Sequence, residues 1–285
     1  MVYKKFIFIG NREFVLNEMI KNNLKIIKAL VVKNSYLEKI IKSKGVEYEI
    51  FDSKKELLEM LNELDYDVLV SNGCPYVLPI KKMKPALYVN IHPSLLPDLR
   101  GKDPVVGAIL FSRTSGATCH IMNEEIDDGD IISQIDIPVT DDVDVTLLYQ
   151  LCFFAEAEVF LKALKNKFIP IKKQYLNDNC IYYSAKENDK IITFKEDNRT
   201  LIRKINAFSN KSQGCMFLYR GSEFKVYRAS IVNNAYIDKI SLGFANLSVI
   251  FKFERDIIFK KDKEIVRFYE IQGDISKIEI NTLIK

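Results

Sequence analysis

The feature that most constrains this chain is the alternation of short apolar segments with longer amphipathic ones over its first 90 residues. Strands that are apolar throughout must be buried on both faces, and parallel strands need crossover helices that cover those faces. The alternation therefore predicts an α/β domain in which a mostly parallel sheet lies between two layers of helices. The expected strands are residues 6–9, 25–32, 46–51, 67–71 and 86–91.

The helices between these strands carry local signals. Asn11 opens a helical pattern after the first strand, and a short helix is expected at 37–41. Ser53, followed three residues later by Glu56, forms a capping-box pattern that predicts a helix through Leu64. The other elements expected in this domain are strands at 117–122 and 131–139 and a long amphipathic helix at 145–164.

The pattern changes after about residue 165. Residues 166–185 have the character of a linker and an entry strand. Beyond them the sequence predicts strands with one helix, at 200–208, and no repeated strand–helix units. We therefore predict two domains, a larger one at 1–180 and a smaller β-rich one at 181–285.

Composition narrows the functional class. The 285 residues include 42 basic and 38 acidic side chains, and the formal net charge of +4 suits anionic small molecules but is weak for nucleic-acid binding. Five cysteines without a CxxC pair argue against disulfides and against a zinc site. The apolar run at 6–9 is too short for a signal peptide, and no run is long enough for a transmembrane helix. We expect a cytoplasmic protein without a metal, a membrane contact or a nucleic-acid partner.

The loops that follow the fourth and fifth strands form the expected ligand site. Open α/β sheets bind ligands beyond the carboxyl ends of their strands, which points to residues 72–75 and 93–104. Asn90 and His92 lie two apart at the end of the fifth strand, so their side chains point to the same side. An amide can hold an oxygen that becomes negative and an imidazole can move a proton, which suits acyl transfer. The alternative is a histidine that only packs at a strand end.

Residues 123–130 form an acidic turn with five carboxylates in eight residues. Such a turn is usually a solvated loop or a cation site, but this one lacks the spacing of an EF-hand loop. The apolar residues Ile131 and Ile132 follow at once, so the end of the turn should be anchored to the core. A carboxylate held there beside His92 would favour the imidazolium and fix its tautomer.

Two motifs in this order resemble the signature of the folate-dependent formyltransferases. This family includes glycinamide ribonucleotide formyltransferase, methionyl-tRNA formyltransferase and the sugar N-formyltransferases. The resemblance covers residues 1–165 well and the remainder weakly. The residues that carry it are 90–97 (NIHPSLLP), Arg100 and Gly101, 116–122 (GATCHIM) and 126–132 (IDDGDII).

The resemblance implies a Rossmann-like, mostly parallel sheet in the N-terminal domain and an OB-like β-rich C-terminal domain. It also implies 10-formyltetrahydrofolate as the co-substrate and a catalytic trio of Asn90, His92 and Asp127. The residues that it places around the folate are Gly73, Pro75, Tyr76, Val77, Leu78, Asn123, Glu124, Glu125 and Ile126. Those expected to contact the acceptor are Ser94, Pro97, Arg100, Gly101, Lys102 and Asp103.

The resemblance also implies a mechanism. A neutral amine attacks the formyl carbon, and Asn90 holds the oxyanion that forms. His92 relays a proton between the two nitrogens, while Asp127 orients the imidazole and supports its charged form. His120 matches a family histidine too, and we expect it to hold hydrogen bonds rather than to react.

The predicted acceptor is the amine of a nucleotide-linked amino sugar, as in lipopolysaccharide biosynthesis. A tRNA-acting relative is expected to carry a basic insertion after its second strand, where residues 31–37 are short and weakly basic here. The glycinamide ribonucleotide enzymes are usually single domains, whereas this chain continues for about 100 residues past the first domain. Methionyl-tRNA formyltransferase stays the alternative.

An alternative from another functional class is a non-catalytic folate or nucleotide binder with the same fold. Such a protein would keep the pocket but is expected to lose Asn90, His92 or Asp127, and all three are present. A dinucleotide-binding enzyme is disfavoured because Gly10 stands outside any GxGxxG pattern. The expected partners are therefore two small molecules, and a homodimer is left open.

Overall fold

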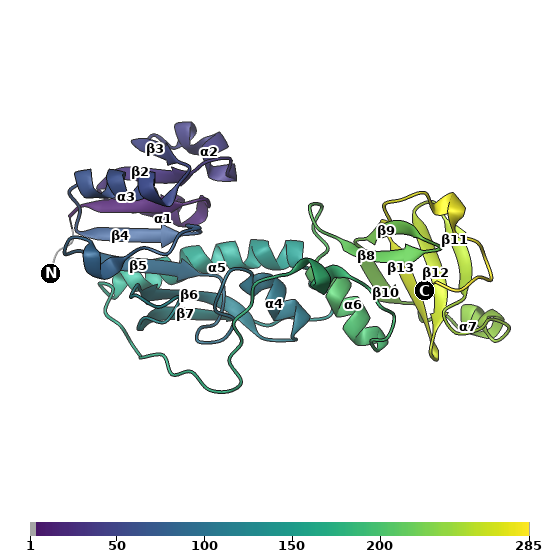
Figure 1. The fold of residues 1–285 in the computed structure, drawn as a ribbon. Helices are drawn as coiled ribbons and strands as arrows, with labels where there is room; N and C mark the ends of the chain where they lie inside the picture. The colour runs from purple at the N-terminus through teal and green to yellow at the C-terminus, as the bar shows by residue number, and fades with distance from the viewer. Residues whose placement is uncertain (1–3, 285) are drawn as a thin grey trace. The chain divides into compact units, whose positions relative to one another are not determined.

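The computed structural model describes residues 4–284, which divide into two compact units (Figure 1). The first unit contains the chain up to Pro104 together with 114–138 and 150–183. The second contains 105–113, 139–149 and the chain from Ser184 onward. The domain boundary at residue 180 stays a prediction.

A seven-stranded sheet forms the centre of the first unit, with the strand order β3-β2-β1-β4-β5-β6-β7. The first five strands in this order are parallel to one another, whereas β6 runs antiparallel to both β5 and β7. The mostly parallel sheet predicted from the apolar segments is therefore confirmed. Its strands are β1 (Phe6–Gly10), β2 (Ile26–Val32), β3 (Tyr48–Phe51), β4 (Val68–Asn72), β5 (Leu87–His92), β6 (Ser115–Ile121) and β7 (Ile131–Ile137).

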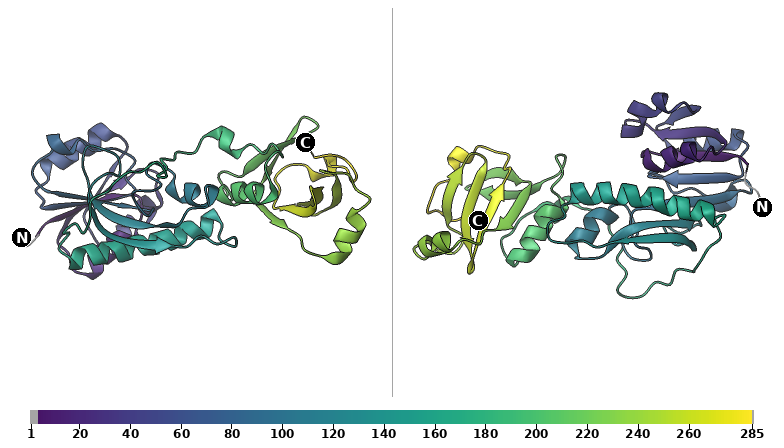
Figure 2. Two further views of the ribbon diagram at one scale, coloured as in Figure 1. Left: turned by 90° about the horizontal axis from the view of Figure 1, so that it is seen from below. Right: turned by 180° about the vertical axis from the view of Figure 1, so that it is seen from behind.

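Helices cover both faces of this sheet (Figure 2). Apolar side chains of α1 and α5 share a buried cluster with Phe6 and Phe8, whereas those of α3 pack with Ile7 and Ile9 on the other face. Alternate residues of β1 thus face opposite layers, as the period of a strand requires. The helices up to residue 165 are α1 (Phe14–Lys21), α2 (Tyr36–Ile40), α3 (Lys54–Glu63), α4 (Pro104–Leu110) and α5 (Val145–Lys165).

One helix cap and one helix start differ in detail from the sequence-based expectation. The Ser53 hydroxyl caps α3 by accepting the Glu56 N–H at 3.2 Å, but the Glu56 carboxylate accepts the N–H of Asp52 rather than that of Ser53. The first helix begins at Phe14 and not at Asn11, because the Asn11 N–H still bonds to the Asn72 carbonyl at 3.3 Å. The turn that results carries two polar side chains beyond the end of β1.

The second unit is β-rich, as predicted. Its strands form a four-stranded antiparallel sheet in the order β10-β13-β12-β11 and a two-stranded sheet of β8 and β9. The sequence indicated one helix here, whereas the structure has a second, α7, whose start is capped by Asn234. The elements are α6 (Asn198–Ala207), β8 (Cys215–Tyr219), β9 (Ser222–Val226), β10 (Arg228–Ile231), α7 (Ala235–Ser241), β11 (Val249–Phe253), β12 (Asp256–Lys261) and β13 (Glu264–Tyr269).

Aromatic packing holds the second unit together. Phe268 lies against Phe259 with a centroid separation of 4.8 Å, and the rings of Phe217 and Phe224 stack at 5.3 Å. A separate apolar cluster lies between the four-stranded sheet and α7. Over residues 4–284, no helix combines the length and the apolar character that crossing a bilayer requires.

Candidate active site

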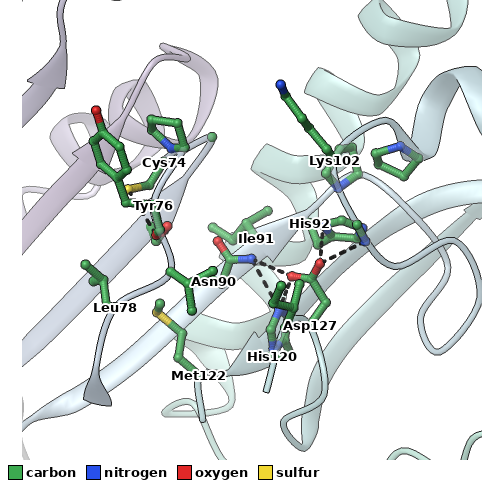
Figure 3. Close-up of a pocket in the computed structure, with 18 of the residues that line it drawn as sticks. Cys74, Tyr76, Leu78, Asn90, Ile91, His92, Lys102, His120, Met122 and Asp127 are labelled. Atoms are coloured by element: carbon green, nitrogen blue, oxygen red, sulfur yellow. Dashed lines mark hydrogen bonds and ion pairs between the residues drawn. The ribbon is translucent and has the colours of Figure 1, made fainter. Parts of the chain in front are cut away.

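A cavity of about 520 Å³ lies at the carboxyl ends of β1, β4 and β5 in the first unit. Its size falls in the range usual for small-molecule sites. Figure 3 places Tyr76 and Leu78 on one side of this cavity and Lys102 on the other, with Asn90 between them. The cavity therefore lies beyond the carboxyl ends of the parallel strands, where a ligand site was expected, and its use as a binding site stays a prediction.

The predicted trio meets at the floor of this cavity (Figure 3). The Asp127 Oδ2 atom lies 3.5 Å from His92 Nδ1, and its Oδ1 atom lies 3.3 Å from Asn90 Nδ2. Two distant stretches of sequence thus bring an amide, an imidazole and a carboxylate into contact. Their catalytic role stays a prediction that this geometry permits.

Local structure explains the convergence. In the antiparallel pairing of β5 and β6, Asn90 lies opposite His120. Asp127 lies in the turn between β6 and β7. Its φ of +52° is a left-handed backbone conformation that is uncommon for residues other than glycine. The backbone N–H of Gly101 donates to Asp127 Oδ2 at 3.3 Å, so the loop after β5 also holds the carboxylate.

Both N–H groups of the Asn90 amide have partners. One points to Asp127 Oδ1 and the other to His120 Nε2, each at 3.3 Å. The His120 Nδ1 atom lies 2.8 Å from the carbonyl of Ile121, which can only accept, so Nδ1 carries the proton and Nε2 is the acceptor. An oxyanion held by Asn90 would therefore have to replace one of these two partners. His120 has the hydrogen-bonding position expected for it.

His92 is buried, with an exposed fraction of 5%. Burial lowers the pKa of His92, and the nearby Asp127 carboxylate opposes this only in part. Its Nε2 atom lies 3.0 Å from the carbonyl of Leu99, so each ring nitrogen faces an oxygen acceptor. A neutral imidazole donates to only one of these two oxygens, and a proton that it takes up finds an acceptor at the other.

Asp127 stays ionised beside it. Burial alone would raise the pKa of Asp127, but the neighbouring imidazoles of His92 and His120 and the N–H of Gly101 hold it well below its ordinary value. A neutral imidazole next to a fixed carboxylate is an arrangement suited to accepting and returning a proton.

The segments predicted to hold the folate form one side of the cavity. Val77 and Ile126 contribute exposed apolar surface to its lining. Glu124 does not line the cavity, because its carboxylate accepts the backbone N–H of Lys81 at 2.7 Å and so ties the acidic turn to the segment after β4. The predicted residues that do line the cavity are Gly73, Pro75, Tyr76, Val77, Leu78, Asn123, Glu125 and Ile126.

Only some of the residues predicted to contact the acceptor line this cavity. Gly101 and Lys102 line the cavity, whereas Ser94 is buried and donates to the Asp98 carbonyl at 2.9 Å. Pro97 and Arg100 line a neighbouring cavity of about 580 Å³. Asp103 lies outside both linings, and its backbone N–H bonds to Tyr183.

The sequence did not indicate several residues of the cavity lining, and Arg12 and Tyr182 are two of them. Arg12 follows β1 and forms an ion pair with Glu156, a fully buried residue of α5 whose pKa burial raises despite this partner. The position of Arg12 beyond a strand end was the signal that could have identified it. Tyr182 reaches the cavity because the linker pairs with the loop at Arg100, and no local pattern indicates that pairing.

Neither a thiolate nor a metal is indicated at the site. Burial raises the pKa of Cys74, which lines the cavity, to about 11, so its thiol stays protonated at neutral pH. Within residues 4–284, no group of three or more His, Cys, Asp or Glu side chains is placed to hold a metal ion.

Known proteins match both parts of the chain. The model of the family described as formyl transferase matches residues 20–164, and that of the formyl transferase C-terminal domain matches residues 185–280. A methionyl-tRNA formyltransferase of Ehrlichia canis is 28% identical over 197 residues, a match that covers 67% of this chain and 62% of the relative. This chain thus spans slightly less than two thirds of that relative.

Two solved structures share the fold. A 4-N formyltransferase from Francisella tularensis is 27% identical with a TM-score of 0.64, over 77% of this chain and 95% of that one. An N-formyltransferase from Helicobacter canadensis, solved with folinic acid and dTDP-3-aminofucose, has a TM-score of 0.71 over 94% of this chain and 99% of that one. At 20% identity, the second likeness concerns the fold alone.

Proposed function

The chain belongs to the formyltransferase family, and on this premise we propose that it transfers a formyl group from 10-formyltetrahydrofolate to the amine of a nucleotide-linked amino sugar. One observation carries the proposal: the contact of Asn90, His92 and Asp127 at the floor of a single cavity. A binder without catalytic function has no evident need for this contact.

The side of the cavity at Tyr76 fits a flat heterocycle with polar edges. Gly73 has a φ of +80°, and a Cβ atom there would lie 2.1 Å from Asn11 Oδ1, so only glycine leaves this corner open. The Asn11 Oδ1 atom is buried and has no hydrogen-bond partner among the described residues. A ligand N–H that reached this corner would supply the missing partner, while Val77 and Ile126 offer apolar surface.

The bound folate supplies the activated formyl group, and the protein supplies the handling of charge and protons. Asn90 is placed to donate to an oxygen that becomes negative, once one of its present partners is replaced. His92 takes a proton from the attacking amine and returns it to the departing nitrogen. Asp127 keeps the imidazole oriented and stabilises its charged form.

The charge of the cavity lining and the short segment after β2 support a nucleotide-linked sugar as the acceptor. Lys102 lines the cavity, and a cation there suits a diphosphate. The segment between β2 and α2 is only three residues long, which leaves no room for a basic insertion that would grip a tRNA. The likeness to a 4-N formyltransferase from Francisella tularensis points in the same direction.

Methionyl-tRNA is the second candidate, because the Ehrlichia canis relative bears that name. A role in lipopolysaccharide biosynthesis, a cytoplasmic location and a homodimer stay predictions. Incubating the protein with labelled 10-formyltetrahydrofolate and either a panel of nucleotide amino sugars or charged methionyl-tRNA separates the two acceptors. Label in a sugar nucleotide supports the proposal. Label in the tRNA alone would identify methionyl-tRNA as the acceptor instead.

A further inference from the structure

The segment between the two matched family regions contributes a side chain to the catalytic turn. Gln174 lies in this segment, beyond residue 164 where the first match ends. Its Nε2 atom donates to the backbone carbonyl of Asp127 at 2.9 Å and to that of Gly129 at 2.7 Å. One side-chain amide thus holds the backbone on both sides of Asp128.

This turn needs external support. Asp127 has a left-handed backbone, which persists only where the surrounding structure enforces it. A Cβ atom on Gly129 would lie 1.8 Å from the Ile121 carbonyl, so the turn is pressed against β6 and cannot shift in that direction. The two hydrogen bonds from Gln174 attach the turn to the linker.

The same amide also engages Arg100. Gln174 Oε1 accepts from the Arg100 guanidinium at 3.0 Å, and that guanidinium forms an ion pair with Asp128 at 2.7 Å. The Arg100 side chain is only 9% exposed. Gln174, Arg100 and Asp128 therefore form a closed brace around the catalytic turn, and this is the role that the structure gives Arg100.

We propose that Gln174 is a positioning residue: it fixes the turn so that the Asp127 carboxylate faces His92, and the linker thereby completes the active site. The inference rests on the proposed function where turnover is the readout, but the state of His92 can be measured without any turnover. Gln174 lies outside the cavity lining and acts only through Asp127.

Loosening the turn should change the pKa of His92 in a predictable direction. The titratable or charged groups that face His92 are Asp127, His120 and Arg12, and of these only Asp127 raises the pKa of His92. A carboxylate within about 4–6 Å shifts the pKa of an imidazole by about one to three units. A partial retreat of Asp127 should therefore lower the pKa of His92 by about half a unit or more.

The test compares Gln174→Met and Gln174→Ala with Lys173→Ala as the matched control, since Lys173 is the exposed neighbour of Gln174. Methionine keeps the length of glutamine without its hydrogen bonds or any new charge. The chain has only two histidines, so NMR titration of labelled imidazoles gives two signals, which His120→Gln assigns. Turnover, KM and the thermal midpoint are measured on the same proteins.

We expect both Gln174 variants to lower the pKa of His92 and to reduce kcat by about tenfold or more, because a misplacement of about 1 Å can cost a hundredfold in rate. KM for the folate and the thermal midpoint of Gln174→Met should stay close to those of the control. An unchanged His92 titration in Gln174→Met would overturn the inference, even if the variant melted early. A shifted titration in a protein that transfers no formyl group would uphold it and refute the proposed function instead.

Discussion

Replacing Asp127 by asparagine removes one negative charge from the centre of the site and preserves the size of the side chain. The carboxylate lies 3.5 Å from His92 Nδ1 and its side chain is only 11% exposed, so solvent screens it weakly. Loss of such a neighbour should lower the pKa of His92 by about one to three units. At 1.36 kcal/mol per unit, the imidazolium loses about 1.4–4 kcal/mol of stabilisation.

Formyl transfer measured as a function of pH reports this change. His92 accepts a proton only in its neutral form, so the acid limb of kcat/KM should move to lower pH in Asp127→Asn. The maximal rate should fall by about a hundredfold to ten-thousandfold, the usual contribution of a positioned acid–base group. A variant that keeps both the rate and the acid limb of the wild-type protein would refute the role given to Asp127.

The same substitution has a separate effect on stability. The pKa of Asp127 is depressed in the folded protein, so its contribution is complete above the unfolded pKa of about 3.9 and is lost as the pH falls below that value. The difference in unfolding free energy between wild type and Asp127→Asn should therefore be largest near neutral pH and shrink in acid. Urea unfolding at a series of pH values measures it.

Three further substitutions test other parts of the site. Asn90→Ala should slow turnover by about a hundredfold or more, since one oxyanion donor is worth about 2.7–4 kcal/mol, and wild-type turnover would contradict its role. Gly73→Ala should raise KM for the folate, because its Cβ would meet Asn11 Oδ1, and an unchanged KM would place the folate elsewhere. Arg12→Ala should destabilise the fold by about 3–5 kcal/mol in urea by leaving Glu156 buried without its partner, whereas equal stability would mean that Glu156 is protonated.

The sequence predicted the parts of the molecule that follow from local pattern. The apolar segments became the strands of the first sheet because their residues are buried on both faces, as at Phe8 and Ile9. That Asn90 and His92 face the same side of β5 was predictable from their spacing, since alternate residues of a strand share a face.

Contacts that depend on tertiary structure could not be predicted in this way. Gln174 and Tyr182 lie in a linker without periodicity, and their positions depend on pairing with loops more than 40 residues away. Arg100 was expected to face the acceptor, but nothing in the sequence indicates its partner Asp128, 28 residues further on. Helix α7 is a single short segment whose start depends on the Asn234 cap.

We propose that the side chains at the floor of this cavity carry formyl transfer. The most direct test follows labelled formyl from 10-formyltetrahydrofolate into a dTDP-linked amino sugar, with the wild-type protein and His92→Gln compared under the same conditions. The account predicts a formylated sugar nucleotide with the first and almost none with the second. Tight folate binding without transfer to any sugar nucleotide or to methionyl-tRNA, or equal transfer by both proteins, would contradict it.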